Sequence, residues 1–431
     1  MKGLNQRLLR QGLDRCLSLA LRPGTALPLR LITCDGVQHD FGPEPRVTVR
    51  LQGPAALRSF LSPSLDRLAD AYVHGRFDVD GPVDEVVAVA AALAQAASGR
   101  SGALARLLRI EQHDRSLDAR AIAYHYDVSN AFYQLWLDPA LVYSCAYFPT
   151  GQEALEAAQQ AKLDHVLTKI GLQPGERLLD IGCGWGALAL RAAQCFGAQV
   201  VGITLSKNQH ALACEQVQRA GLADRVELRL QDYRELDPRE GLFDKITSIG
   251  MFEHVGLAHL GDYFRKIQAL LKPGGLVMNH GITTTDPGNG AAPLGADAFI
   301  SRYVFPHGEL PHIGLVLQRM QEAGLEALDA ECLRRHYERT LTLWSQRYEA
   351  QSDAIRTQVD EQTFRIWRIY LAGCAYAFAQ NWVSLYQVLA CQAGADAQLN
   401  PTPWSRAYMY PTGAGCVRLS VPAGGPRPRP I

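Results

Sequence analysis

The stretch Leu178-Leu179-Asp180-Ile181-Gly182-Cys183-Gly184-Trp185-Gly186 decides the fold of this chain. It follows the pattern of a buried strand, and the segment Ala187–Cys195 after it has the composition of a helix. The glycines let the backbone turn tightly and approach a ligand closely. Ligands of open α/β sheets bind at the carboxyl ends of the strands. We therefore expect a ligand at this loop, the alternative being a plain strand-to-helix turn.

Outward from this loop, strand and helix patterns alternate between Ala154 and Ile282. Such alternation predicts a parallel sheet with helices on both faces. The expected strands are Arg177–Ile181, Gln199–Ile203, Val226–Leu230, Lys245–Ile249 and Leu276–His280. The expected helices are Ala187–Cys195, Asn208–Ala220 and Leu260–Leu271, the last stopped by Pro273-Gly274-Gly275. A Gly/Pro-rich stretch, Thr284–Gly295, precedes segments rich in Tyr and Trp, which we expect to be helical to about Cys391.

Residues 1–120 are expected to form a separate α+β module, because a strand pattern at Arg46–Leu51 is followed by helical spacing over Pro54–Asp70. Ala/Leu-rich helices follow, and they carry Arg100, Arg106, Arg109 and Arg115. These arginines indicate either a solvated face or a basic patch that meets anionic lipid. We place a catalytic domain at residues 121–395 and a C-terminal extension at 396–431, with its end disordered.

The composition excludes several classes of protein. Of 431 residues 47% are apolar, and 43 basic residues balance 43 acidic ones, which argues against disorder and against charge-driven binding to nucleic acid. The longest apolar candidate, Val86–Ala97, is too short to span a bilayer, and the N-terminus lacks the core of a signal peptide. Ten cysteines without a CxxC pair argue against disulfides and structural zinc. These features predict a protein of the reducing cytoplasm with no metal site.

The loop spacing points to a particular cofactor. It reads GxGxG with Asp180 two residues before the first glycine, unlike the GxGxxG of dinucleotide-binding proteins. This departure favours S-adenosylmethionine, whose methionine end is zwitterionic and carries no pyrophosphate. The second strand is followed by no acid, so Ser206 and Gln209 are candidates to hydrogen-bond the ligand, while Asn208 is also a candidate helix cap. Asp232 is placed to accept from an adenine amino group, or lies in a surface turn.

Three further segments carry a resemblance. Tyr143-Ser144-Cys145-Ala146-Tyr147-Phe148 precedes the sheet, Gly250-Met251-Phe252-Glu253-His254-Val255-Gly256 follows the fourth strand, and His336-Tyr337-Glu338-Arg339-Thr340-Leu341 lies near the C-terminal helices with Trp344. Together with the glycine loop, they resemble the cyclopropane-fatty-acid synthase and mycolic acid methyltransferase family. The resemblance covers about His125-Tyr126-Asp127 to Leu389, and the first 120 residues only loosely. It implies a Rossmann-like methyltransferase sheet with helical insertions that form the lipid site.

The resemblance also implies the site residues. The cofactor would be held by Tyr143, Ser144, Leu178, Leu179, Asp180, Ile181, Gly182, Cys183, Gly184, Trp185, Gly186, Thr204, Leu205, Ser206, Lys207, Asn208, Gln209, Asp232, Tyr233 and Arg234. A bicarbonate ion, the base that removes a proton from the added methyl group, would be held by Cys145, Glu253, His280, Ile282 and Tyr337. Cys374 matches a cysteine proposed as a nucleophile, but its position between Gly and Ala is also typical of close packing.

Methyl transfer to an alkene produces a carbocation, which aromatic faces stabilise. The candidates are Phe148, Phe252, Tyr303, Phe305 and Trp344, although aromatic residues in such positions are also common in cores. Asn279 stands beside His280 where the family has an apolar residue. It either alters the base site and the product, or faces away from the site because side chains alternate along a strand.

We therefore expect a cytoplasmic enzyme, peripherally associated with the inner face of the membrane, that converts unsaturated phospholipid acyl chains to cyclopropane chains. Two alternatives stay open within the fold: methyl-branched acyl products, or methylation of a soluble amine or phenol. A third alternative is a lipid-binding protein that lost catalysis. The expected partners are phospholipid acyl chains at the membrane surface, with a homodimer possible through the N-terminal module and no nucleic acid.

Overall fold

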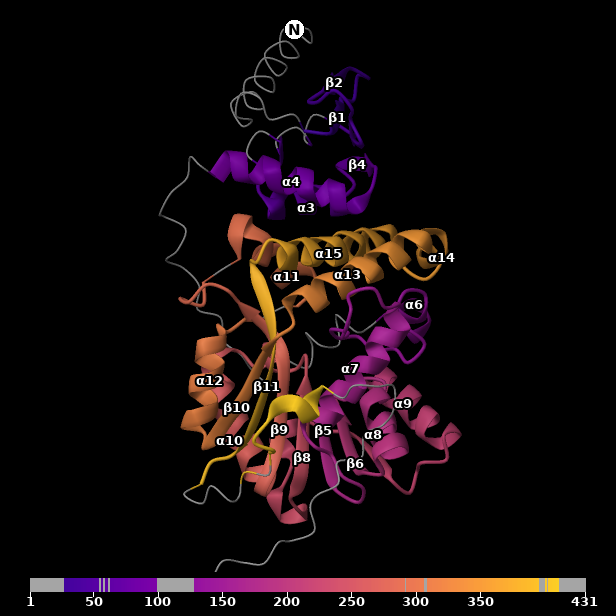
Figure 1. The fold of residues 1–431 in the computed structure, drawn as a ribbon. Helices are drawn as coiled ribbons and strands as arrows, with labels where there is room; N and C mark the ends of the chain where they lie inside the picture. Colours follow the sequence, from indigo (N-terminus) through magenta and orange to yellow (C-terminus); the bar gives the residue numbers. More distant parts are fainter. Residues whose placement is uncertain are drawn as a thin grey trace, which may run out of the picture.

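A computed structural model describes residues 27–53, 56, 59–60, 63–98, 128–290, 292–305, 308–394, 400 and 402–410. In this part of the chain, a small N-terminal module is stacked on a larger α/β domain (Figure 1). The predictions for the basic residues 100, 106, 109 and 115, for His125-Tyr126-Asp127, and for the end of the C-terminal extension lie outside the described residues.

The large domain is built on a seven-stranded sheet in the order β10-β11-β9-β8-β5-β6-β7. Its parallel strands are β5 (Arg177–Ile181), β6 (Gln199–Thr204), β7 (Val226–Leu230), β8 (Phe243–Ile249) and β9 (Leu271–Thr284). All five predicted strands are confirmed, with their boundaries extended by a few residues in three cases. The expected Rossmann-like arrangement is therefore correct for this part of the sheet.

Two more strands complete the sheet at one edge, where we expected helical segments. They are β10 (Leu325–Cys332) and β11 (Val383–Gln392), and each pairs antiparallel with its neighbour. The expectation was wrong because a short apolar run such as that of β11 has no period that separates a buried strand from a buried helix. Asn381, with φ of 57°, reverses the chain just before β11.

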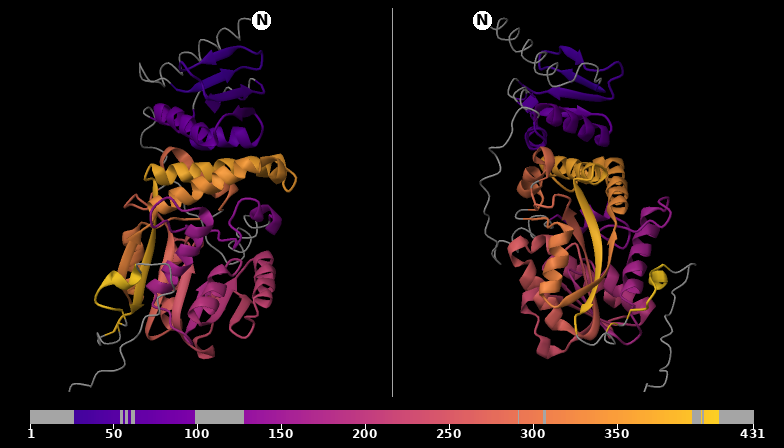
Figure 2. Two further views of the ribbon diagram at one scale, coloured as in Figure 1. Left: turned by 45° about the vertical axis from the view of Figure 1, so that its right-hand side comes forward. Right: turned by 60° about the vertical axis from the view of Figure 1, so that its left-hand side comes forward.

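Helices cover both faces of the sheet and cross one of its ends. The predicted helices are confirmed as α8 (Ala187–Phe196), α9 (Lys207–Arg219) and α10 (Leu260–Leu270). The others are α6 (Asn130–Gln134), α7 (Leu155–Lys169), α11 (Ala296–Tyr303), α12 (Ile313–Glu322), α13 (Arg334–Ala350), α14 (Ser352–Arg356) and α15 (Glu361–Ala379). Figures 1 and 2 show α11, α13 and α15 between the sheet and the N-terminal module.

The N-terminal module contains a four-stranded sheet in the order β2-β1-β3-β4. Its elements are β1 (Leu29–Ile32), β2 (Gln38–Asp40), β3 (Val47–Leu51), α3 (Leu65–Val73), β4 (Phe77–Asp80) and α4 (Val83–Ser98). The predicted strand at 46–51 is confirmed as β3. The single helix predicted from residue 54 to residue 70 is wrong at its centre: Pro63 and the extended N-cap Ser64 interrupt it, and α3 starts at Leu65.

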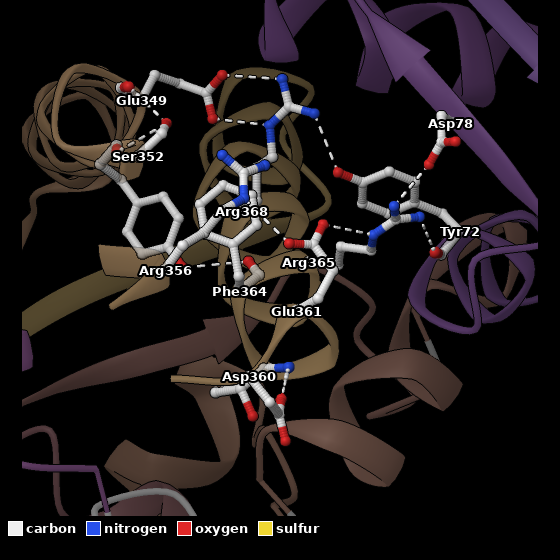
Figure 3. A network of polar contacts seen from close by, with 12 residues as sticks. Tyr72, Asp78, Glu349, Ser352, Arg356, Asp360, Glu361, Phe364, Arg365 and Arg368 are labelled. Carbon is white, nitrogen blue, oxygen red and sulfur yellow. Dashed lines mark hydrogen bonds and ion pairs between the residues drawn. The ribbon is translucent and has the colours of Figure 1, made fainter. Parts of the chain in front are cut away.

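Two arginines of α15 join the N-terminal module to the large domain (Figure 3). Arg365 donates to the Asp78 carboxylate at 2.5 Å and to the Tyr72 carbonyl at 3.0 Å. Arg368 donates to the Tyr72 hydroxyl at 3.0 Å and to both oxygens of Glu349 at 2.8 Å. Because both guanidinium groups are largely buried and fully engaged, these contacts hold α3 against α15. No helix in the described parts of the chain is long and apolar enough to cross a membrane.

Candidate functional site

The glycine loop joins β5 to α8 as predicted. Its three glycines have φ of 80°, 55° and 85°, a backbone region that favours glycine. The N–H groups of Gly182 and Cys183 donate to the Ile203 carbonyl at 3.0 and 2.9 Å, which ties the loop to the end of β6. A Cβ placed on Gly184 would meet no atom within 4 Å, so the backbone here faces open space.

That space is a cavity of about 690 Å³ at the carboxyl ends of β5 and β6. Most of the residues expected to hold the cofactor line it: Tyr143, Ser144, Asp180, Ile181, Gly182, Cys183, Gly184, Trp185, Thr204, Leu205, Gln209, Asp232, Tyr233 and Arg234. The donor and acceptor groups of this set fit the adenosine and methionine ends of S-adenosylmethionine. The cavity is therefore where the sequence predicted it.

Six residues from the same expectation do not line the cavity. Leu178 and Leu179 are fully buried in the sheet core, and Gly186 is the N-cap residue of α8. Ser206 N-caps α9 by accepting from the Gln209 N–H at 3.3 Å, and Lys207 and Asn208 are exposed on the first turn of that helix. The motif thus marks the whole loop, but only residues 180 to 185 of it line the cavity.

Two buried ionisable side chains, Asp180 and Lys162, lie near the glycine loop. Burial raises the pKa of Asp180 to about 6, although the Thr247 hydroxyl donates to it at 2.8 Å. Burial also lowers the pKa of Lys162 to about 8, and its Nζ donates to the Ser144 hydroxyl at 2.9 Å. Both side chains line the cavity, so the methionine end of the cofactor would meet a carboxylate and an ammonium group. The sequence reasoning did not include Lys162.

A second, larger cavity of about 1190 Å³ adjoins the first one. Tyr143, Ser144, Gly250 and His254 line both, so the cofactor space and this largely apolar space meet at these residues. All five residues expected to hold bicarbonate line the second cavity: Cys145, Glu253, His280, Ile282 and Tyr337. They come from four separate parts of the chain, and the fold brings them together.

Backbone geometry explains the position of Glu253. Strand β8 ends at Ile249, opposite His280, and the Gly250 N–H donates to the His280 carbonyl at 2.8 Å. The chain then turns through η4 (Phe252–His254), so the Ile282 N–H has no partner on β8. Glu253 Oε1 accepts this N–H at 2.7 Å. Ile282, which we expected to help hold bicarbonate, thus orients the Glu253 carboxylate through its backbone amide instead.

Two buried atoms at this site have no hydrogen-bond partner among the described residues, namely Glu253 Oε2 and His280 Nε2. Burial raises the pKa of Glu253 to about 7 and lowers the pKa of His280 well below its usual value. A buried carboxylate oxygen and a buried ring nitrogen without hydrogen-bond partners reduce the stability of the fold, unless a ligand forms hydrogen bonds with both. A small anion with a hydroxyl group, such as bicarbonate, fits this pair. Burial also raises the pKa of the Tyr337 hydroxyl, which therefore stays a donor.

Gly281 permits the close packing on which this geometry depends. A Cβ at this position would lie 1.7 Å from Cε1 of Phe252. The ring of Phe252 therefore rests directly on the backbone of β9 between His280 and Ile282. Because Glu253 follows Phe252, the absent side chain of Gly281 sets how closely the carboxylate approaches the strand.

The aromatic residues around the cavity differ from those expected. Of the five candidates for stabilising a cation, only Phe305 lines the cavity. Trp344, Phe148 and Phe252 are packed in cores, and the Tyr303 hydroxyl donates to Asp70 at 2.7 Å. The aromatic residues that do line the cavity are Phe60, Tyr72 and Phe77 of the N-terminal module and Tyr143, Phe299, Phe305, Tyr337, Tyr370, Tyr376, Phe378 and Trp382 of the large domain. Four of them come from α15 and the turn after it.

Asn279 lies on the face of β9 opposite to His280. Its side chain is buried, and its Oδ1 accepts from the Tyr263 hydroxyl at 3.2 Å, beneath α10. Of the two interpretations of this residue, the structure thus supports the one in which it faces away from the base site.

The chain is similar to proteins of one known family. The model of the mycolic acid cyclopropane synthetase family matches residues 113–388. The chain belongs to this family. The cyclopropane synthetase resemblance is thereby confirmed, and the family identifies the chain as an S-adenosylmethionine-dependent methyltransferase of the cyclopropane synthase type.

Individual relatives support the same conclusion. A probable fatty acid methyltransferase of Pseudomonas putida is 48% identical over 384 residues, 89% of this chain and 96% of that protein. The cyclopropane-fatty-acyl-phospholipid synthase of Escherichia coli strain K12 is 39% identical over 265 residues, 62% of this chain and 66% of that protein. The crystal structure of mycolic acid cyclopropane synthase CmaA1 with SAH and CTAB is 33% identical, with a TM-score of 0.60, and covers 65% of this chain and 99% of that one.

Cys374 lines the large cavity from α15, where burial raises the pKa of its thiol to about 12. The group is thus a neutral thiol near pH 7 and a poor nucleophile. We expect Cys374→Ser to keep turnover within about threefold, because the hydroxyl replaces the thiol with little change in volume. Steady-state kinetics with labelled cofactor measures this, and a loss of 100-fold or more would restore the nucleophile assignment.

Four buried polar residues near the site were not among those predicted from the sequence. Lys162, His165 and Lys169 lie on one face of α7, and all three are buried. Their spacing of three and four residues places them on the same helical face, which is the signal that was available. Gln387 was missed for another reason, since β11 was not recognised as a strand.

Proposed function

We propose that the protein transfers the methyl carbon of S-adenosylmethionine to the cis double bond of unsaturated acyl chains of membrane phospholipids and closes a cyclopropane ring. The observation that carries this proposal is the junction of the two cavities. The cofactor space opens at Tyr143, Ser144, Gly250 and His254 onto an apolar cavity whose wall holds Glu253 and His280. A methyl donor, an apolar chain and a base would thus meet at one place.

The apolar walls serve the first half of the reaction. S-adenosylmethionine supplies an electrophilic methyl group, and an alkene is a weak nucleophile that must be held in line with it. The cavity around Phe299, Phe305 and Leu385 excludes water and orients the chain. Tyr143 and Tyr370, whose hydroxyls lie 3.2 Å apart, present aromatic faces near the junction. Such faces stabilise positive charge on the acyl chain.

The base site serves the second half. Ring closure removes one proton from the carbon just added, and bicarbonate supplies a base small enough to enter the cavity. Glu253 would accept the hydroxyl of the ion, while His280 and Tyr337 would donate to its oxygens. Two observations support this arrangement: the unsatisfied atoms of Glu253 and His280, and the apolar surroundings that would strengthen hydrogen bonds to an anion.

The N-terminal module extends the apolar cavity. Residues of its sheet and of α3 and α4 line the same cavity as the base site: Leu29, Val47, Val49, Leu65, Leu68, Val79, Val83, Val87 and Leu93. This continuity supports a lipid-docking role for the module, in which it covers acyl chain that extends beyond the reacting double bond. The enzyme would then act at the cytoplasmic surface of the membrane, and the same module would be the site of any homodimer.

The proposal is tested by mass spectrometry of phospholipids from a host that expresses the chain and contains unsaturated acyl chains. We expect a gain of one CH2 for each double bond, with the alkene consumed. A gain on soluble amines or phenols, with unchanged lipids, would contradict the proposal. A methyl-branched product would be distinguished from a cyclopropane by its open chain. The side chain of Asn279 faces away from His280, so this residue gives no support to a methyl-branched product.

A further inference from the structure

A row of polar side chains crosses the sheet at the base site. His280 on β9 is the register partner of Gln387 on β11, and Gln387 is the register partner of Glu331 on β10. Partners in adjacent strands project to the same face. Helix α7 covers this face and adds the fully buried Lys169, together with His165.

His280 carries one proton in this environment. Its ring is fully buried, and burial together with the charges of Lys162 and Lys169 keeps its pKa well below the usual value. Its Nδ1 lies 3.1 Å from Nε2 of Gln387, and its Nε2 has no partner among the described residues. The neutral ring has one donor nitrogen and one acceptor nitrogen, so the location of the single proton decides what His280 offers to the cavity.

Lys169 determines which way the Gln387 amide points. Its Nζ donates to Oε1 of Gln387 at 3.3 Å. An ammonium group only donates, so it requires the amide oxygen and excludes the flipped arrangement, in which two donors would face each other. The NH2 group of Gln387 must then face His280. Because that group also only donates, Nδ1 of His280 must be the acceptor, and the proton lies on Nε2.

Lys169 is itself held in place. Its Nζ lies 2.5 Å from Oε2 of Glu331 and 3.2 Å from Oδ2 of Asp329. Burial would raise the pKa of Glu331, but the hydrogen bond from His165 and the charge of Lys169 together lower it to about 2. His165 Nε2 lies 2.8 Å from the same carboxylate oxygen. The His165 ring stacks on the ring of Tyr147, with the two ring centroids 4.1 Å apart. The buried ammonium is thus compensated whether or not Gln387 is present.

We propose that Gln387, oriented by Lys169, is a positioning residue that keeps the proton of His280 on Nε2. This N–H is then available to an anion in the cavity that His280 and Glu253 both line. This role deepens the proposed function, because a donor at Nε2 is what an anionic base in this cavity requires. The opposite tautomer would present a lone pair to that anion and repel it. Gln387 contacts neither substrate nor cofactor in this role; it acts through His280.

The tautomer is measured directly by NMR of the full chain labelled with 15N-histidine. We expect long-range correlations of the Nε2–H form for His280, assigned by the loss of its signals in His280→Gln. A proton on Nδ1 in the unsubstituted protein would overturn the inference. This result does not depend on which base binds or on which product forms, so its failure is distinct from failure of the proposed function.

The kinetics of Gln387→Met provide a second test of the role of Gln387. Methionine has a similar length, and Lys169 keeps its two carboxylates, so we expect the variant to fold. In metal sites, loss of the residue that fixes the tautomer of a ligating histidine typically lowers metal affinity or activity about 10-fold to 100-fold. By analogy, we expect kcat of Gln387→Met to fall by about this factor, with cofactor affinity unchanged. Leu389→Met, on the same face of β11, is the matched control and should keep kcat. An unchanged kcat in Gln387→Met, or an equal loss in both variants, would overturn the inference.

Discussion

Replacing Glu253 by glutamine is expected to remove most of the cyclopropane formation on acyl chains while making the folded protein more stable at pH 8. Glutamine keeps the shape of the side chain and still accepts the Ile282 N–H through its oxygen. Its amide nitrogen, however, cannot accept the hydroxyl of the base. Misplaced proton transfer typically costs about 10²–10⁴-fold in rate, and we expect kcat to fall within this range.

The gain in stability follows from the pKa of Glu253, which burial raises from 4.5 to about 7. A carboxyl group with a raised pKa binds its proton more tightly in the folded protein, so folding stability falls as pH rises from about 4.5 to about 7. At about 1.4 kcal/mol for each pKa unit, the carboxylate destabilises the fold by roughly 3 kcal/mol above pH 7. Glutamine carries no charge, so its advantage is expected at pH 8 and should shrink toward pH 5.

Three measurements separate these effects: kcat with lipid vesicles, cofactor affinity by calorimetry, and Tm at pH 5 and pH 8. Glu309→Gln is the matched control, because Glu309 also lines the large cavity and accepts a backbone N–H, that of Leu257, at 2.8 Å. It should change kcat by no more than a few fold. Full turnover in Glu253→Gln, with unchanged cofactor binding, would contradict the role given to this carboxylate.

A second large effect is expected from Gly281→Ala, which adds one methyl group next to His280 on β9. The new Cβ would lie 1.7 Å from the ring of Phe252, and that ring is buried. Overpacking of this kind costs about 1–3 kcal/mol. The turn that carries Glu253 must also move, and a displacement of about 1 Å at a catalytic group can lower the rate about 100-fold.

Rescue by a second substitution tests the cause of that loss. The double variant Gly281→Ala/Phe252→Leu removes the clash and should recover part of both Tm and kcat, because contacting residues show non-additive effects. Gly53→Ala, where a Cβ meets no atom within 4 Å and φ is ordinary, should behave like the parent. If Gly281→Ala were as active and as stable as the parent, the packing of Phe252 on β9 would not position Glu253.

The parts of the fold that were predictable are those with strong local patterns. Strands β5 to β9 alternate with helices, and the turn at Gly182 combines an apolar strand, glycines and a helix start. The antiparallel edge was not predictable in the same way, because β11 follows a long apolar helix without a change in composition. Its partner β10 is half exposed, and a pattern of small and charged residues there has no clear period.

The residues of the site also differ in whether a local sequence pattern could identify them. Of the twenty residues expected to hold the cofactor, fourteen line the first cavity, and six of these lie in the loop from Asp180 to Trp185. Gln387 becomes a neighbour of His280 only through the pairing of β9 with β11, which local sequence does not encode. The aromatic lining was misassigned for a related reason: Tyr370 reaches the cavity because α15 crosses the end of the sheet. Phe148, which is close to the motif in sequence, is packed in the core.

The most direct test of the central claim uses the purified full chain with labelled S-adenosylmethionine, vesicles of unsaturated phospholipid, and bicarbonate either present or removed. We expect label to enter the phospholipid fraction as cyclopropane-containing acyl chains, and the rate to fall sharply when bicarbonate is removed. Label that enters only a soluble acceptor, or a rate of ring formation that is indifferent to bicarbonate, would contradict it.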